Sequence, residues 1–319
     1  IIIVKSTVIP ETSQKTILPI LERESRKKDQ VGFYLLTNPE FLRETKAIED
    51  TLNPHLVVIG GQSAAASKLK RFYSNLHPKT PIITTNHQTA EMIKYANNSF
   101  LATKISFINQ IASICEAIPG SNIETVAKAI GTDPRIGSLF LSAGPGYGGS
   151  CLPKDVKAII RFSTKYCVRS PLLDAVDQIN EEQLKRIITI IEKKIGKISG
   201  KTISVLGLAF KADTDDIRDS VSIKLIELLL KRKAKIIAHD PKAIDNAKAV
   251  LGDKIEYTVS IRDALKDSCC TVILTPWRDY ANINNDDIRS MKKKIIIDSR
   301  RMLSDHKLNA DYYAIGIGK

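Results

Sequence analysis

The stretch Thr202-Ile203-Ser204-Val205-Leu206-Gly207 predicts a buried β-strand that ends at a glycine turn. The pattern continues with an expected capped helix and three further short apolar runs, at residues 220–231, 235–238, 271–274 and 294–297. Because strands alternate with helical segments here, the sequence predicts a doubly wound α/β domain built on a parallel sheet.

The front of the chain shows the same alternation. Ile1–Val4 is expected to be a buried strand, followed by a helix at Thr12–Lys27 and an apolar strand at Val31–Leu36. A strand, a helix and a second strand form the unit of a parallel sheet. Between the two α/β parts, an amphipathic pattern predicts one long helix from about Gln88 to Ala117, which could join domains or pair with a symmetry mate.

We therefore predict an α/β fold with two doubly wound Rossmann-like domains, the first of them incomplete, joined by a long central helix and a helical dimerisation region. The expected boundaries are residues 1–88 for the first domain, 89–197 for the central helical domain and 198–319 for the second α/β domain. A length of 319 residues supports this division, because a single core seldom grows to that size.

The composition indicates a globular protein. Hydrophobic residues make up 43% of the chain and charged residues 26%, and no apolar run approaches the ~20 residues that a membrane span needs. Because no signal peptide is visible either, we expect a cytoplasmic protein. The five cysteines are scattered, odd in number and without metal-ligand spacing, which predicts free thiols in a reducing compartment and no metal site.

The net charge of +13 is compatible with a nucleic-acid partner, an anionic substrate or a lysine-rich surface. The positive residues are dispersed, aromatic residues make up only 6% of the chain, and no named nucleic-acid motif is present. We therefore expect no nucleic-acid partner, and keep a basic nucleic-acid binder as a minor alternative.

The strongest chemical signal is the string Gly144-Pro-Gly-Tyr-Gly-Gly-Ser-Cys-Leu-Pro-Lys-Asp155. Its four glycines let a backbone bend closely around a ligand. Pro153 suits the first turn of a following helix, so Cys151 is expected near a helix N-terminus with Lys154 beside it, and both features favour the thiolate. This predicts a nucleophilic cysteine; a buried cysteine beside a glycine turn is the structural alternative.

The string closely resembles the active-site loop of the UDP-glucose and GDP-mannose dehydrogenase family. Further family motifs occur in the right order: Lys5-Ser-Thr-Val8, Asn38-Pro-Glu-Phe-Leu-Arg-Glu44, Glu91-Met-Ile-Lys-Tyr-Ala-Asn-Asn98, Gly207-Leu-Ala-Phe-Lys211, Asp213-Thr-Asp-Asp-Ile-Arg-Asp-Ser220 and Asp298-Ser-Arg300. One departure is Thr45, which stands where the family usually has a glycine.

The resemblance implies an NAD-dependent enzyme that oxidises the CH2OH group of a nucleotide sugar to a carboxylate, through a thiohemiacetal and a thioester on Cys151. The motifs are closer to the UDP-glucose branch, with GDP-mannose as the alternative substrate. Ser150 argues against the N-acetylmannosamine branch, which usually has histidine before the cysteine. The family places the arginine corresponding to Arg135 in the partner subunit's substrate site, which implies a homodimer.

The resemblance also implies roles for residues beyond the thiol. Lys94 and Asn98, four residues apart on one helix face, would stabilise the developing oxyanion. Asp155 would orient Lys94 or a water, Thr7 would hold a water, and Glu40 is a candidate base for hydrolysis.

The implied NAD contacts are Thr7, Glu44, Lys154 and Arg218, with Glu44 near the nicotinamide. The implied contacts with the nucleotide sugar are Glu40, Phe41, Leu42, Arg43, Lys94, Asn98, Arg135, Phe140, Tyr147, Gly148, Gly149, Ser150, Phe210, Lys211 and Arg300.

The sequence contains no Gly-x-Gly-x-x-Gly pattern followed about twenty residues later by an acidic residue. The family carries this pattern ahead of the strand with which this chain starts, so we expect the front of the NAD-binding domain to be absent and NAD binding by this chain alone to be weak or nil. Two interpretations stay open: a dehydrogenase that has lost its front, and a non-catalytic UDP-sugar-binding dimer.

Overall fold

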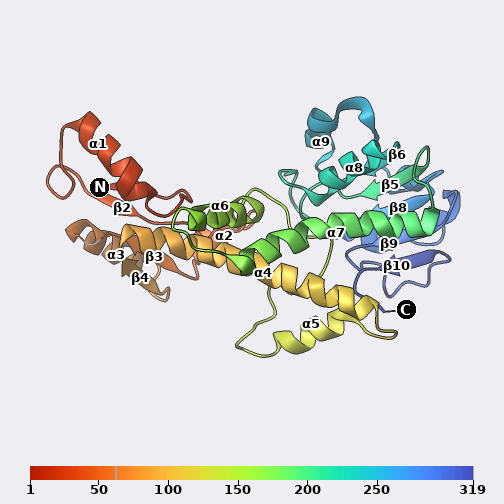
Figure 1. Cartoon of the computed structure of the whole chain (residues 1–319), viewed down its shortest axis with the longest axis horizontal. Coiled ribbons are helices and arrows are strands. Elements are labelled where there is room, and N and C mark those ends of the chain that lie inside the picture. Colours follow the sequence, from red (N-terminus) through yellow and green to blue (C-terminus); the bar gives the residue numbers. More distant parts are fainter. Residues whose placement is uncertain (62, 319) are drawn as a thin grey trace. The chain divides into compact units, whose positions relative to one another are not determined.

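The computed structural model describes residues 1–61 and 63–318, and the chain divides into two compact units (Figure 1). The N-terminal unit comprises Ile1–Phe100 and Ala158–Arg169, and the C-terminal unit comprises Leu101–Lys157 and Ser170–Lys319. Two helices, α4 (His87–Glu116) and α6 (Leu152–Thr164), contribute residues to both units.

The N-terminal unit is built on a four-stranded sheet. In spatial order its strands are β1 (Ile2–Val4), β2 (Leu35–Thr37), β3 (Val57–Gly60) and β4 (Ile82–Thr85). β1 runs parallel to β2 and β3 parallel to β4, whereas β2 and β3 meet antiparallel through the pair Thr37 and Gly60. The intervening helical segments are η1 (Ser13–Ile17), α1 (Leu18–Ser25), α2 (Ala47–Leu52) and α3 (Ala64–Leu76).

Two expectations for this unit are wrong. The first strand was expected to be buried, but β1 lies at the edge of the sheet with only β2 beside it, and Ile1 is 60% exposed. The second strand begins at Leu35 instead of Val31. A positive φ of 64° at Gln30 turns the chain there, which leaves Val31 85% exposed.

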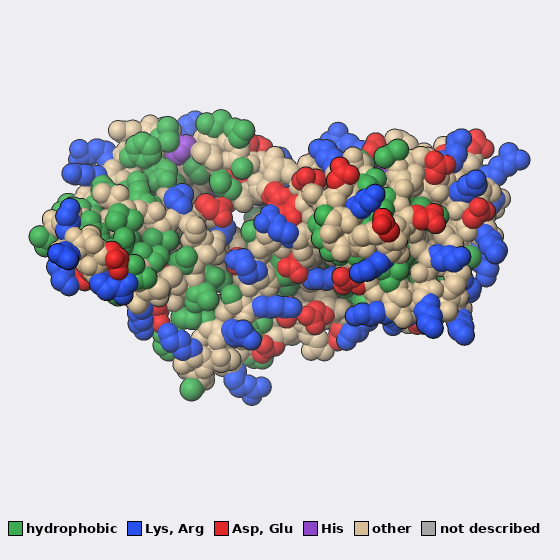
Figure 2. Space-filling model, turned by 90° about the horizontal axis from the view of Figure 1, so that it is seen from above, with side chains coloured by type: hydrophobic (Ala, Val, Ile, Leu, Met, Phe, Trp, Pro, Cys, Tyr) green, Lys and Arg blue, Asp and Glu red, His purple; other side chains and the backbone are tan. Residues whose placement is uncertain are grey.

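A small core joins this sheet to its helices. Its buried members are Leu36, Val57, Ile59, Ala65 and Ala66. Other large apolar side chains of the unit, among them Phe72 and Leu76 of α3, are exposed. Figure 2 shows hydrophobic side chains gathering over this unit, toward the left of the view.

The C-terminal unit is built on six parallel strands. They are β5 (Thr202–Leu206), β6 (Lys235–His239), β7 (Glu256–Thr258), β8 (Cys270–Ile273), β9 (Ile295–Asp298) and β10 (Asp311–Ala314). Their spatial order is β10-β9-β8-β5-β6-β7, so the chain proceeds outward from β5 in one direction and from β8 in the other. This order confirms the predicted doubly wound domain, and ligands of such sheets gather at the carboxyl ends near the change of direction.

Helices α8 (Val221–Lys231), α9 (Ile244–Leu251) and α10 (Ile261–Leu265) connect these strands, and the unit also contains α5 (Ile123–Gly131) and α7 (Pro171–Ile195). Ser220 caps α8 as expected, because its side-chain oxygen accepts the N–H of Ser222. Short 3-10 turns complete the unit: η2 (Gly252–Lys254), η3 (Arg278–Asn282) and η4 (Asp287–Ser290). Within the described residues, no helix combines the length and apolar character needed to cross a membrane.

Candidate active site

In the N-terminal unit, the segment after β2 lies against helix α4. A carboxylate oxygen of Glu40 lies 3.3 Å from the Nζ of Lys94, and the ring centroid of Phe41 lies 5.2 Å from the same Nζ. The N–H of Leu42 donates to the Glu40 carboxylate. Lys94 is buried, and so is Asn98 one helical turn later. The buried ammonium is therefore compensated by a carboxylate and a ring face.

A second buried polar group on α4 was missed from the sequence. The carboxylate of Glu91 accepts the backbone N–H groups of Glu11 and Ser13, at 2.7 and 2.9 Å. The Ser13 hydroxyl lies 2.9 Å from that of Thr37, which lies 2.8 Å from Nδ1 of His87. Burial lowers the pKa of His87. The available clue was that Glu91 opens the same quoted motif, one turn before the predicted lysine.

The remaining predicted residues of this unit lie in turns. Arg43 holds Asp50 of α2 through its Nε and Nη2, and this pairing keeps the pKa of Asp50 at about 2. Glu44, and Thr7 in the turn after β1, are half-buried. Thr45, where the resemblance expects a glycine, has a φ of 73°. The turn thus keeps a conformation that suits glycine and strains a β-branched residue.

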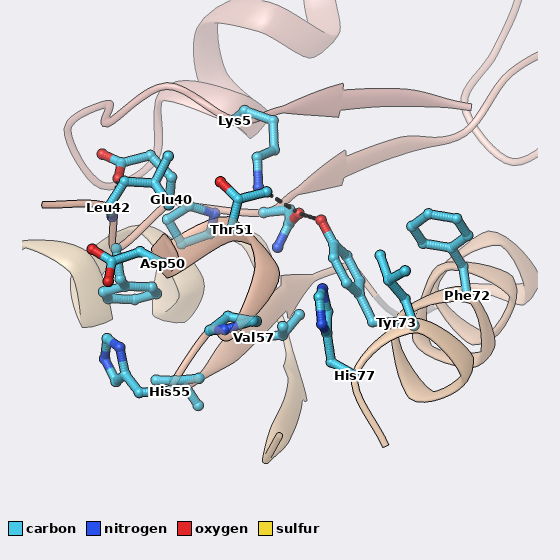
Figure 3. A pocket seen from close by; sticks show the side chains of 16 residues that line it. Lys5, Glu40, Leu42, Asp50, Thr51, His55, Val57, Phe72, Tyr73 and His77 are labelled. Atoms are coloured by element: carbon cyan, nitrogen blue, oxygen red, sulfur yellow. Dashed lines mark hydrogen bonds between the residues drawn. The ribbon is translucent and has the colours of Figure 1, made fainter. Parts of the chain in front are cut away.

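A cavity of about 320 Å³ lies between the segment after β2 and helix α3, and Figure 3 shows the side chains that line it. The Nζ of Lys5 and the hydroxyl of Tyr73 both donate to Oδ1 of Asn38, at 3.0 and 2.7 Å. Other lining residues include the predicted Glu40, Phe41 and Leu42 together with Leu56, Val57, Phe72 and Leu76. Tyr73 and the lining residues His55 and His77 were missed, because no spacing in the sequence marks them. The cavity can hold a small, largely apolar group.

In the C-terminal unit, hydrogen bonds hold the glycine loop from several sides. Asn180 of α7 brackets Tyr147: its Oδ1 accepts the Tyr147 N–H at 2.7 Å and its Nδ2 donates to the Tyr147 carbonyl at 3.1 Å. The N–H of Gly144 donates to Oδ1 of Asn109 at 2.7 Å. The N–H of Gly149 donates to the backbone oxygen of Arg218 at 3.0 Å. The loop is thereby tied to α4, to α7 and to the segment before α8.

Two of the loop's glycines are required by close approach. A Cβ at Gly148 would lie 2.4 Å from the backbone oxygen of Asp219, and one at Gly149 would lie 2.7 Å from the ring of Phe210. Gly149 also has a φ of 83°. The neighbouring backbone leaves no room for a side chain at Gly148, so the path of the loop depends on glycine there.

Cys151 directly precedes α6, and its thiol is exposed. Its backbone oxygen accepts the N–H of Asp155 at 2.9 Å, which begins the helical hydrogen-bond pattern. The expected position at a helix N-terminus is therefore present. The hydroxyl of Ser150 lies 3.6 Å from the Cys151 sulfur. The ammonium of Lys154 lies 2.7 Å from the buried carboxylate of Asp155.

The segment after β5 carries predicted nucleotide-sugar contacts. The Nζ of Lys211 lies 5.4 Å from the ring centroid of Phe210. The guanidinium group of Arg218 donates bidentate hydrogen bonds to the carboxylate of Asp216, from Nε and Nη2 at 2.6–3.0 Å. This contact sets the direction of the guanidinium group, which remains largely exposed.

Arg300, the last residue of the motif Asp298-Ser-Arg300, lies against the glycine-rich loop that precedes Cys151. A Cβ added to Gly144 would lie 2.8 Å from Nη1 of Arg300. The Nε of Arg300 donates to the backbone oxygen of Leu274 at 2.7 Å. Burial, together with the neighbouring charge of Arg301, lowers the pKa of Arg300 to about 10, so the group is still charged at neutral pH.

Arg135 and Phe140 lie nearer the surface. The guanidinium of Arg135 pairs with Asp133 at 2.6 Å and is 87% exposed. Phe140 is partly exposed and has a positive φ of 64°.

Asp240, at the end of β6, was also missed. Its buried carboxylate accepts the backbone N–H groups of Leu208 and Ala209, at 2.7 and 3.0 Å, and the indole N–H of Trp277 at 2.9 Å. It therefore fixes the turn that leads to Phe210. The clue was an acidic residue directly after an apolar strand, before Pro241.

The predicted residues thus form two groups, one in each unit. The N-terminal unit holds Thr7, Glu40, Phe41, Leu42, Arg43, Glu44, Lys94 and Asn98. The C-terminal unit holds Arg135, Phe140, Tyr147, Gly148, Gly149, Ser150, Cys151, Lys154, Asp155, Phe210, Lys211, Arg218 and Arg300.

Three family models match the chain. Residues 1–77 match the NAD binding domain, residues 88–182 the central domain and residues 204–305 the UDP binding domain of the UDP-glucose/GDP-mannose dehydrogenase family.

Similar whole proteins point the same way. UDP-glucose 6-dehydrogenase TuaD of Bacillus subtilis is 40% identical over 320 residues, which cover 99% of this chain and 68% of TuaD. UDP-glucose 6-dehydrogenase AglM of Haloferax volcanii is 40% identical over 95% of this chain and 71% of its own length. The structure of a UDP-glucose dehydrogenase from the archaeon Pyrobaculum islandicum aligns with a TM-score of 0.88 at 34% identity, covering 99% of this chain and 70% of that one. With this similarity along nearly its whole length, the chain belongs to the UDP-glucose/GDP-mannose dehydrogenase family.

Proposed function

We propose that this protein oxidises UDP-glucose to UDP-glucuronate with NAD. The observation that carries the proposal is the exposed thiol of Cys151, held at the start of α6 by a glycine loop whose path excludes larger side chains. UDP-glucose is favoured over GDP-mannose because TuaD, AglM and the Pyrobaculum islandicum enzyme are all named for UDP-glucose.

In the proposed reaction, the sugar CH2OH group first loses a proton and a hydride to give the aldehyde. The Cys151 thiolate adds to the aldehyde carbon, and the resulting thiohemiacetal, in its alkoxide form, loses a second hydride to become a thioester. Water, held by Thr7 and deprotonated by Glu40, then releases the carboxylate and restores the thiolate. Accepting the two hydrides is the chemistry that NAD supplies when bound.

Lys94 and Asn98 are proposed to stabilise the negative oxygen that develops in these steps. The burial of both side chains on α4 supports this role, because preorganised donors act most strongly where water is excluded. Asp155, buried in the first turn of α6, is proposed to orient Lys94 or a water.

The residues proposed to hold NAD are Thr7, Glu44, Lys154 and Arg218. Their chemistry suits the group: a hydroxyl and a carboxylate can bond the amide and ribose, and two exposed cations can meet phosphates. The direction that Asp216 gives the Arg218 guanidinium supports this assignment.

The nucleotide sugar is proposed to contact both groups of residues. In the C-terminal unit we assign it Tyr147, Gly148, Gly149, Ser150, Phe210, Lys211 and Arg300, and in the N-terminal unit Glu40, Phe41, Leu42, Arg43, Lys94 and Asn98. Backbone N–H groups of the loop and the charges of Lys211 and Arg300 suit a diphosphate sugar.

We further propose a homodimer or higher oligomer in which Arg135 serves the partner's substrate site, and we assign Phe140 to the contacts with the nucleotide sugar. The exposed guanidinium of Arg135 supports this role. A cytoplasmic location is supported by the five cysteines, all of which are free thiols.

The test is an absorbance assay for NADH with UDP-glucose and NAD, accompanied by isothermal titration with each ligand separately. We expect NADH formation in the wild type and none after Cys151→Ser. The matched control is Cys167→Ser, which removes the other exposed thiol and should leave the rate unchanged.

The titration separates the two remaining interpretations. UDP-glucose binding without NADH formation would identify a non-catalytic UDP-sugar-binding protein. Tighter binding and faster oxidation of GDP-mannose would show that GDP-mannose, not UDP-glucose, is the substrate. Acid formation by Cys151→Ser would show that the thiol is not needed for the reaction.

A further inference from the structure

The C-terminal unit contains a cavity of about 590 Å³ bounded by α7 and α8. Part of its lining is aliphatic, from Leu184, Ile188, Val221 and Leu228. The charged lining residues are Lys157, Lys185, Lys224, Arg232, Glu181 and Glu227. Cations thus outnumber carboxylates around an apolar surface.

Most of these cations already have partners. Three of them pair with carboxylates: Lys157 with Glu181 at 3.0 Å, Lys224 with Asp219 at 2.7 Å and Arg232 with Glu192 at 3.2 Å. Lys185 makes no ion pair within the part of the chain that the structure describes. An unpaired ammonium beside aliphatic side chains suits a ligand with an anionic group on an apolar body.

Tyr147 adds an independent indication of a ligand. Tyr147 lines the cavity and is 5% exposed, and its buried hydroxyl has no hydrogen-bond partner among the described residues. Burial, with the nearby carboxylates of Asp177 and Glu181, raises the pKa of Tyr147, so the hydroxyl is a donor at neutral pH. Buried donors are nearly always satisfied, and an acceptor oxygen of a ligand would satisfy this one.

We propose that this cavity binds a small amphipathic carboxylate. The ligand's aliphatic body packs on Val221, Ile188 and their neighbours, and its carboxylate accepts hydrogen bonds from the Tyr147 hydroxyl and from Lys185. Tyr147 is the one residue that this site shares with the proposed nucleotide-sugar contacts, and binding of the carboxylate can be tested without NAD or UDP-glucose.

The cavity also shares its walls with the supports of the thiol loop. Asn180 lines the cavity and brackets the backbone of Tyr147 on both sides. The other wall, α8, begins just after Asp219, whose backbone oxygen leaves no room for a side chain at Gly148. A bound carboxylate therefore restrains the loop that ends at Cys151, and the second part of the proposal is that occupancy lowers the reactivity of this thiol.

The first experiment is isothermal titration of the whole protein with octanoate, which has a carboxylate and an aliphatic body. Octanol tests whether the aliphatic chain alone binds, and inorganic phosphate tests whether negative charge alone binds. We expect octanoate to bind and both comparison probes to bind at least roughly tenfold more weakly. No binding of octanoate by the native assembly, as when a second copy of the chain fills the cavity, would overturn the proposal.

Variants then locate the site. Val221→Trp fills the cavity and should abolish octanoate binding, and Lys185→Glu should weaken it roughly tenfold. Lys254→Glu, an equal change of charge at an exposed lysine on η2, is the matched control and should leave it unchanged. Tyr147→Phe removes only the hydroxyl, keeps the fold and should weaken binding severalfold. Wild-type affinity in Val221→Trp, or in both Tyr147→Phe and Lys185→Glu, would place octanoate elsewhere and defeat the assignment.

The second experiment measures alkylation of Cys151 by iodoacetamide, followed by peptide mass spectrometry. Cys167 is also exposed and lies in the N-terminal unit, so it serves as a reference within the same molecule. We expect octanoate to slow Cys151 alkylation in the wild type, with no effect on Cys167 and none on Cys151 in Val221→Trp. Unchanged Cys151 alkylation at saturating octanoate would overturn the link to the thiol loop.

Discussion

The Nζ of Lys94 lies 3.3 Å from a carboxylate oxygen of Glu40, which joins helix α4 to the segment after β2 inside the N-terminal unit. Only 6% of the Lys94 side chain is exposed, against 30% for Glu40. The pair therefore has a buried, fixed positive end and a negative end within reach of solvent. This asymmetry suits the roles proposed for the two residues, Lys94 as a fixed donor and Glu40 as a base that exchanges protons with water.

Replacing Lys94 with methionine should lower kcat for NADH formation by about 100-fold or more, because the proposed reaction would lose its preorganised donor to the developing oxyanion. The initial rate of NADH formation at saturating UDP-glucose and NAD measures this kcat directly. Lys68→Met, at an exposed position on α3, is the control and should retain wild-type kcat. A Lys94→Met variant with near wild-type turnover would show that Lys94 takes no part in the chemical steps.

Gly148→Ala should lower kcat/KM by roughly tenfold or more, because its Cβ would lie 2.4 Å from a backbone oxygen and the loop must move away. Gly252→Ala is the matched control: its φ is 59° but a Cβ there meets open space. That change should cost only about 1 kcal/mol of stability and leave the kinetics intact. Equal kinetics for the two variants would show that the tight contact at Gly148 is unimportant.

Thr45→Gly should stabilise the N-terminal unit by about 1 kcal/mol, because threonine is strained at a φ of 73°. Urea unfolding followed by circular dichroism measures the change. The same substitution at Thr51, inside α2, should destabilise by about 1 kcal/mol, since glycine is a poor helix former. Loss of stability in both variants would mean that Thr45 is not strained.

The ion pair of Arg43 with Asp50 predicts a pH dependence. The pKa of Asp50 is held at about 2, below the ~3.9 of an unfolded chain, so its stabilisation is present above about pH 4 and is lost as the pH falls through 2. Asp50→Asn should therefore be less stable than wild type near neutrality, with the difference shrinking in acid. Asp253→Asn, at an exposed site on η2, should show no such convergence. A constant difference across the range would contradict the assignment.

Much of the architecture could be predicted because its signals are local. The strands at 202–206 and 235–239 are apolar runs between helical segments, and the glycines around Cys151 stand together in the sequence. The edge strands β7 and β10 could not be predicted, because Glu256-Tyr-Thr258 and Asp311-Tyr-Tyr-Ala314 are short, begin with acidic residues and are partly exposed. Exposure of β1 was also unforeseeable, since burial depends on which strand lies beside it.

Two of the site residues missed from the sequence, Glu91 and Asp240, share a physical cause. Glu91 accepts the N–H of Ser13, 78 residues away, and Asp240 accepts that of Leu208, 32 residues away. In both cases the partner is a backbone group, which every residue type carries, so no pattern of side chains reveals the contact. Asn180, which brackets Tyr147, belongs to the same class.

Asp240 has a kinetic consequence for the proposed reaction. Its carboxylate accepts the N–H groups of Leu208 and Ala209 at the turn after β5, where a dinucleotide-binding Rossmann domain receives a pyrophosphate, so these two N–H groups are already occupied. Two successive oxidations would then share a single cofactor position. In the proposed reaction, spent cofactor would leave and fresh cofactor would arrive while the half-oxidised sugar stays attached to Cys151, and the lifetime of that attachment would set how much free aldehyde escapes.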